Sequence, residues 1–191
     1  MPENPTAKRP SAESDWTYGM CALDTPSERF GPFESLIECW NRRRDDRRLP
    51  ARGDFPVEDF APWMGRIFIA RMEWEPFNLR FTLWGTTLVE WWGVDYTNKT
   101  LGEESIAPEN WRDELAYFRD MARAPFIGVA SGYLSQHERR FIKVVGLDMP
   151  MGDADQVSHV LSAHVKIALD ASVESVMPDC PIIPHAVSMA P

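Results

Sequence analysis

The chain has 191 residues, a formal net charge of −9 and a pI near 4.9. This length is enough for one domain with a sizeable core and too short for two ordinary domains with a linker. The acidic balance argues against a nucleic-acid-binding surface, because phosphate contacts require a basic one. The three cysteines are dispersed without a CxxC pair, and no stretch approaches the about 18 apolar residues of a membrane helix. We therefore expect a soluble cytoplasmic protein without a disulfide framework.

The N-terminal part of the chain predicts a flexible segment followed by a helix. Residues 1–28 are rich in Pro, Ser, Glu and Lys, a composition typical of mobile chain. Within them, the apolar piece from Trp16 to Cys21 is expected to pack back on the domain or on a partner. A helix is predicted from about residue 33 to 48, because apolar side chains recur there at helical spacing after Pro32. Its apolar stripe consists of Phe33, Leu36, Ile37 and Trp40.

The interpretation of the fold depends most on the stretch LRFTLWGTTLVEWWGVDYTNKTL, from Leu79 to Leu101. Apolar residues alternate with others in its first part, which predicts a strand. Thr87 and Glu90 have the spacing of a capping box, and Gly93 is suited to end a short helix in the left-handed conformation. A helix this short is stable only when it packs on a sheet.

Alternation and turn residues predict five strands in all, with a longer helix between the second strand and the third. The strands are expected at about residues 66–74, 79–84, 126–134, 139–147 and 157–169, and the longer helix begins near Pro108. In the last strand His159 lies on the apolar face, whereas His164 and Lys166 share a polar face that we expect to be solvated. From about residue 170 the chain is again rich in proline, which predicts a C-terminal tail over residues 171–191.

The order of these elements, two strands, two helices and three strands behind an N-terminal helix, resembles a PAS domain. Short motifs sharpen the likeness to a divergent family of small bacterial stand-alone PAS proteins, which covers about residues 33–169. They are LPARGDFP at 49–56, LWGT at 83–86, WGVD at 92–95 with Thr97, and MPM at 149–151. The resemblance implies an α+β fold, a five-stranded antiparallel sheet with helices packed on one face and an N-terminal amphipathic helix. We expect this PAS-like domain to span residues 29–170.

As a class, PAS domains sense small molecules, redox state or light, or mediate dimerisation, and the resemblance implies this range of functions. A haem-binding member needs an axial histidine on a helix beside the pocket, but all four histidines fall in predicted strands, turns or the tail. Covalent flavin chemistry needs a cysteine on the helix after the second strand, and none lies between Cys39 and Cys180. Haem and covalent flavin are therefore not expected. No metal site is expected either, because the spacing of His159 and His164 places them on opposite faces of a strand.

The tryptophans offer the sharpest hypothesis for a ligand site. Trp91 and Trp92 are adjacent on a short helix and cannot both point into the core, so one of them is expected to line a hydrophobic pocket. The alternative is that these rings are core aromatics and that His159 is a core histidine, rather than one that orients a polar ligand. The candidate pocket residues are Trp84, Trp91, Trp92, Trp111, Tyr133 and His159.

The sequence favours a non-enzymatic sensory or interaction module, because no GxSxG, HExxH or phosphate-binding loop occurs in it. We expect a homodimer that forms through the predicted helix, with Phe33, Ile37 and Trp40 in contact, and that signals through a partner protein. A small apolar or aromatic ligand would fit the candidate pocket. Two alternatives stay open. One is a small isomerase or dehydratase with a cone-shaped fold like that of nuclear transport factors, with His159 as the base. The other is a dimerisation adaptor with a filled core.

Overall fold

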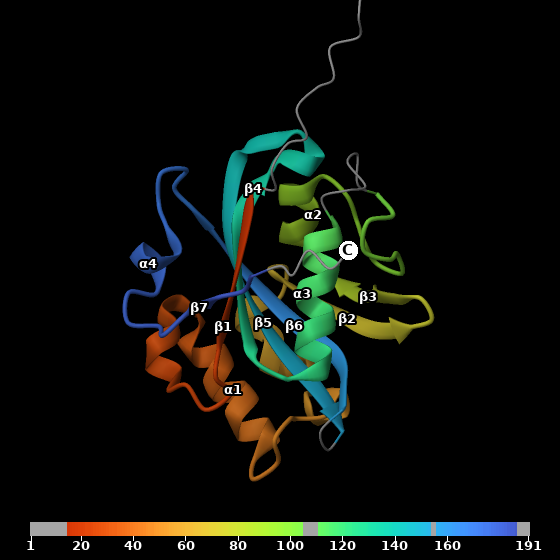
Figure 1. Ribbon diagram of the computed structural model, residues 1–191, viewed down its shortest axis with the longest axis vertical. Helices are drawn as coiled ribbons and strands as arrows, with labels where there is room; N and C mark the ends of the chain where they lie inside the picture. Colours follow the sequence, from red (N-terminus) through yellow and green to blue (C-terminus); the bar gives the residue numbers. More distant parts are fainter. Residues whose placement is uncertain (1–14, 105–110, 154–155, 187–191) are drawn as a thin grey trace, which may run out of the picture.

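A seven-stranded antiparallel sheet forms the centre of the computed structural model, which describes residues 15–104, 111–153 and 156–186 (Figure 1). The strand order is β3-β2-β6-β5-β4-β1-β7. The strands are β1 (Trp16–Cys21), β2 (Ile67–Trp74), β3 (Phe77–Trp84), β4 (Ile127–Leu134), β5 (Arg139–Asp153), β6 (Gln156–Ile167) and β7 (Ile183–Pro184). The helices are α1 (Glu34–Arg44), α2 (Thr86–Trp92), α3 (Trp111–Arg123) and α4 (Val173–Val176). Short 3-10 helices are η1 (Ser27–Phe33), η2 (Arg52–Asp54), η3 (Val57–Trp63) and η5 (Ser135–His137).

The five predicted strands are confirmed as β2 to β6, but the sheet has seven strands rather than five. β1 comes from the N-terminal segment that was expected to be flexible, and β7 comes from the proline-rich tail. All six residues of β1 pair with residues 127–132 of β4, which is bare on one face: a side chain at Gly132 would overlap the Trp16 ring. The apolar residues near the N-terminus therefore cover a surface that β4 leaves open.

Helices cover both sides of this sheet (Figure 1). α3 contacts β6 and β3, and α2 contacts β5; we call the side that they cover the α3 face. α1 lies against the opposite side, where the Trp40 indole N–H donates to the Pro150 carbonyl at 3.0 Å. Because both sides are covered, both faces of β5 and β6 are largely buried. None of the described helices is long and apolar enough to cross a membrane.

The predicted N-terminal helix is confirmed but ends earlier, at Arg44. Its apolar stripe is buried in the core of the same chain: the Phe33, Ile37 and Trp40 side chains are all at most 2% exposed. The Phe33 ring, for example, stacks on Trp63 of η3 at 5.4 Å. The prediction that these three side chains form a dimer contact is therefore wrong.

The short helix after the second predicted strand is confirmed as α2, and Gly93 ends it with a φ of 77°. The predicted capping box is wrong, because Gly85 is the N-cap residue and no side chain caps the helix. Gly85 occupies this position since it packs directly on the backbone of Gly65. The predicted start of the longer helix, Pro108, lies outside the described residues, and α3 is described from Trp111.

Candidate ligand site on the α3 face

Aromatic rings from four elements, β2, β3, α2 and β6, meet on the α3 face at the β3 end of the sheet. The Trp84 ring stacks on Phe68 with 5.3 Å between centroids and meets Trp92 of α2 edge-on at 5.6 Å. The His164 imidazole, from β6, lies 5.6 Å from the Phe68 ring and 5.3 Å from the Trp92 ring. Phe68 and Trp92 therefore each contact both Trp84 and His164, and we call these four residues the aromatic cluster.

Three buried polar atoms in or beside the aromatic cluster have no hydrogen-bond partner among the described residues. They are Trp84 Nε1, His164 Nδ1 and Ser162 Oγ. Ser162 precedes His164 by two residues on β6 and is paired with Phe68 in the sheet register, so it shares their face. Leaving a buried polar group unpaired costs about 1–3 kcal/mol, and nearly all buried polar groups have a protein group or an ordered water as partner. Two further atoms of this kind, Asn41 Oδ1 and His185 Nδ1, belong to other parts of the structure.

The aromatic cluster offers uncharged hydrogen-bonding groups. The His164 side chain is 4% exposed, and burial lowers its pKa to about 3, so the imidazole is neutral at physiological pH. The Trp84 indole N–H is a donor only, whereas a hydroxyl and a neutral imidazole each provide a donor and an acceptor. The expectation that His164 is solvated is therefore wrong, because α2 covers this end of β6.

A buried carboxyl lies next to the aromatic cluster on the same face. Asp148 of β5 is paired with Ser162 in the register, is 3% exposed, and accepts a hydrogen bond from the Tyr117 hydroxyl of α3 at 2.8 Å. Burial raises the pKa of Asp148 to about 6, and the Ser162 and Tyr117 hydroxyls offset part of that increase. The Ser162 hydroxyl is thus near enough to favour the carboxylate, although it does not reach hydrogen-bond geometry with it.

Further groups of α3 and β1 surround this carboxyl. Glu114 keeps some solvent contact, and burial of its carboxyl together with the charge of Asp148 raises its pKa. The Tyr18 ring of β1 lies 4.8 Å from the Tyr117 ring, and burial raises the pKa of both phenols. At neutral pH the two phenols and the Glu114 carboxyl therefore keep their protons, whereas Asp148, with a pKa of about 6, is largely ionised.

Gly128 allows Tyr117 to reach Asp148. A side chain at Gly128 would overlap the Tyr117 hydroxyl and would come within 2.9 Å of Met121 Cε. The tyrosine thus crosses β4 only because β4 has no side chain at this position. The bare face of β4 and the polar face of β6 were visible in the sequence, but Asp148, Tyr117 and Ser162 were not identified as candidate site residues.

The structure separates the six predicted pocket residues into three groups. Trp84 and Trp92 lie together in the aromatic cluster. Trp91 and Trp111 are partly buried against the core, and within the described residues no ring contact joins them to the aromatic cluster. Gly132 and Val160 share the α3 face with Gly128 and Ser162, because residues two apart on a strand point to the same side. Their neighbours Tyr133 and His159 therefore lie on the opposite side of the sheet.

His159 does not have the surroundings of a general base. Its Nδ1 lies 2.9 Å from the Ser158 hydroxyl, and burial together with the nearby Arg52 and Arg71 lowers its pKa. In the cone-shaped enzymes that this alternative resembles, the base histidine is paired with an aspartate. The buried carboxyl of Asp148 lies on the other side of the sheet, so this structure does not pair the two.

One comparison with known proteins bears on the chain as a whole. A family model described as PAS domain matches residues 30–143, which is more than half of the chain and runs from η1 into β5. Searches of curated proteins and of solved structures give no match.

Proposed function

The chain belongs to the PAS domain family, and we propose that it is a non-enzymatic sensory module that binds a small aromatic ligand at the aromatic cluster. The observation that carries this proposal is the set of three buried, unpartnered polar atoms, on Trp84, Ser162 and His164. A ligand that pairs with these atoms would remove an energetic cost that the chain alone bears.

The chemistry of the aromatic cluster defines the ligand class. Flat rings on Phe68, Trp84 and Trp92 favour a planar ligand, because aromatic pairs stack or meet edge to face. The Trp84 N–H requires an acceptor, and Ser162 and His164 accommodate a donor or a second acceptor. With a neutral His164 and the acidic Asp148 nearby, an anionic ligand is disfavoured. We therefore propose an uncharged heteroaromatic molecule.

The proposal includes signalling through a partner protein and self-association as a homodimer in the cytoplasm. Because the apolar stripe of α1 is buried, these contacts would use other apolar side chains. The large apolar side chains that are exposed among the described residues are Val57, Met64, Trp74, Phe141, Leu169 and Ile183.

The test is a native mass spectrum with an absorbance spectrum of the full chain, purified under mild conditions. We expect a mass above that of the chain or of its multiple, and release of the excess on denaturation as a small molecule absorbing in the ultraviolet. Chromatography of the released fraction then identifies it. A mass equal to that of the bare chain or its multiple, in protein that is folded by circular dichroism, would contradict the sensor proposal and favour an adaptor with a filled core.

A further inference from the structure

The C-terminal part of the described chain forms a strap across one edge of the sheet. Residues 177–186, the strap, leave α4 on the side opposite the α3 face, and β7 within the strap pairs with β1 (Figure 1). The strap then reaches α3, where His185 Nε2 lies 3.0 Å from Asp120 Oδ2. It therefore connects the two sides of the sheet.

Two thiols meet where the strap passes the end of β1. Cys21 is the last residue of β1 and is 2% exposed, and its Sγ lies 3.3 Å from the Sγ of Cys180 in the strap. Both are free thiols, and Cys180 is partly exposed. A disulfide bond has a length of about 2.05 Å, so the two sulfur atoms need to approach by only about 1 Å to form one. The third cysteine, Cys39, is instead buried beside Asp59.

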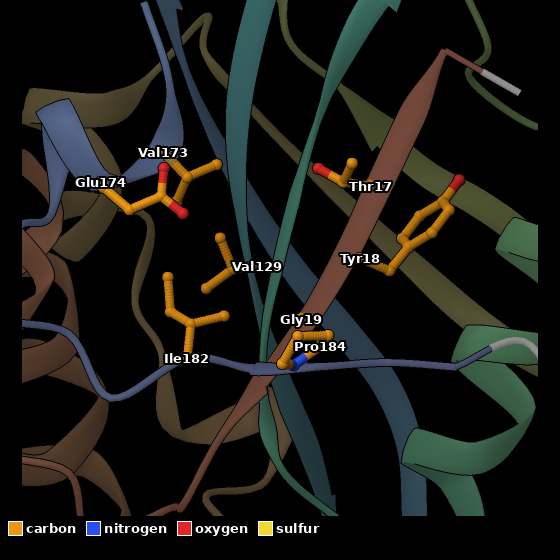
Figure 2. A pocket seen from close by; sticks show the side chains of 8 residues that line it. All are labelled: Thr17, Tyr18, Gly19, Val129, Val173, Glu174, Ile182 and Pro184. Atoms are coloured by element: carbon orange, nitrogen blue, oxygen red, sulfur yellow. The ribbon is translucent and has the colours of Figure 1, made fainter.

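Part of the strap borders a cavity. This cavity of about 260 Å³ separates that part from the sheet, with Thr17 and Val129 on the sheet side and Ile182 and Val173 opposite them (Figure 2). Figure 2 also shows that the Tyr18 side chain points away from this cavity, toward the other side of β1. The Cys180 and Ile182 backbone N–H groups donate within the strap, to Met177 and Cys180, and do not tie this part to the sheet.

The two thiols have different environments. The hydrogen bond between the two thiols lowers the pKa of Cys180, whereas the same contact and burial raise the pKa of Cys21. The thiolate is the reactive form of cysteine. Cys180 is thus the more exposed and the more readily ionised of the pair, and Cys21 is held in contact with it.

We propose that Cys21 and Cys180 form a site of reversible oxidative modification by hydroperoxides. With hydrogen peroxide, the Cys180 thiolate attacks one oxygen, forms sulfenic acid and releases hydroxide. The Cys21 sulfur then attacks the Cys180 sulfur, the disulfide forms, and the sulfenic hydroxyl leaves with the Cys21 proton as water. The peroxide gains two electrons and the thiol pair loses two. A dithiol reductant reverses the change. The disulfide fixes the strap to β1, and the proposal does not depend on a ligand at the aromatic cluster.

The test treats the full folded chain with hydrogen peroxide and maps its peptides without reduction. We expect a peptide linked through Cys21 and Cys180 that dithiothreitol separates. Because the native fold holds the two thiols together, we expect the link to form at least tenfold faster in the folded chain than in the chain unfolded in urea. Amide exchange across residues 177–186 should slow at least threefold in the oxidised form.

Two variants provide the controls. Cys39→Ser should form the same link at the same rate, and Cys180→Ser should not form it. Sulfinic acid at Cys180 without the link would overturn the proposal, as would equal rates in the folded and unfolded chains or links that involve Cys39 as often. The wild-type peptide map decides between these outcomes even if a variant does not fold.

Discussion

Replacement of Asp148 by asparagine should make the stability of the chain less dependent on pH. Asp148 is 3% exposed, and its pKa rises from 3.8 in the unfolded chain to about 6 in the folded one. A group whose pKa is raised on folding contributes stability that is fully present below the unfolded pKa and is lost as pH rises through the folded pKa. A shift of about 2 pKa units, at about 1.4 kcal/mol per unit, corresponds to about 3 kcal/mol in all. About 2.5 kcal/mol of it is lost between pH 4 and pH 8, because pH 4 already lies above the unfolded pKa.

Asp148→Asn avoids this loss, because the amide carries no charge and its oxygen still accepts the Tyr117 hydroxyl. The assay is urea unfolding of both proteins at pH 4, 6 and 8. The difference in unfolding free energy, variant minus wild type, should rise by about 2.5 kcal/mol from pH 4 to pH 8. Titration of His164 affects both proteins alike and cancels from the difference. The loss of the Asp148 charge also lowers the pKa of Glu114, which acts in the same direction.

Asp153→Asn, on the same strand but exposed, is the matched control and should show little change at any pH. A difference for Asp148→Asn that stays constant within about 0.5 kcal/mol across this range would refute the assignment of Asp148 as a buried, ionisable carboxyl.

Two further substitutions test the packing of the α3 face. Gly128→Ala should destabilise the chain by about 2–5 kcal/mol in urea unfolding, because it displaces the Tyr117 hydroxyl from Asp148 and overfills the space near Met121. The control is Gly53→Ala, which has no atom within 4 Å of the new methyl group and should change stability by less than about 1 kcal/mol. Equal effects of the two substitutions would contradict this account. His164→Phe should leave the unfolding free energy at pH 7 within about 1 kcal/mol of wild type, because the imidazole Nδ1 has no partner to lose among the described residues. A loss above about 3 kcal/mol would show that His164 makes a structural hydrogen bond.

The strands β2 and β3, the short helix α2 and the central strands were predictable because their signals are local. Alternation in Leu79 to Trp84 marks β3, and Gly93 ends α2 because glycine accepts its positive φ without strain. β1 and β7 were not predictable as strands of this sheet, because each is held by pairing with residues far away in the sequence. The prolines near both segments instead predicted a flexible N-terminal segment and a C-terminal tail.

The candidate site was harder to predict than the fold. Alternation on β6 separated His159 from His164 correctly but could not show which side of the strand carries the aromatic cluster, since both sides of the sheet are covered. The polar face of β6 was expected to be solvated, but it lies on the α3 face, which helices cover. Asp148 carried no signal of its own, because its role depends on Tyr117 and Gly128 from two other elements.

The central claim is that the aromatic cluster holds a small molecule through Trp84, Ser162 and His164. Its most direct test is the native mass spectrum of wild type recorded beside His164→Phe and His159→Phe. We predict a mass excess in wild type and in His159→Phe, whose substitution lies on the opposite side of the sheet, and its loss in folded His164→Phe. Equal excess in all three proteins would place the ligand elsewhere, and no excess in any of them would contradict the claim.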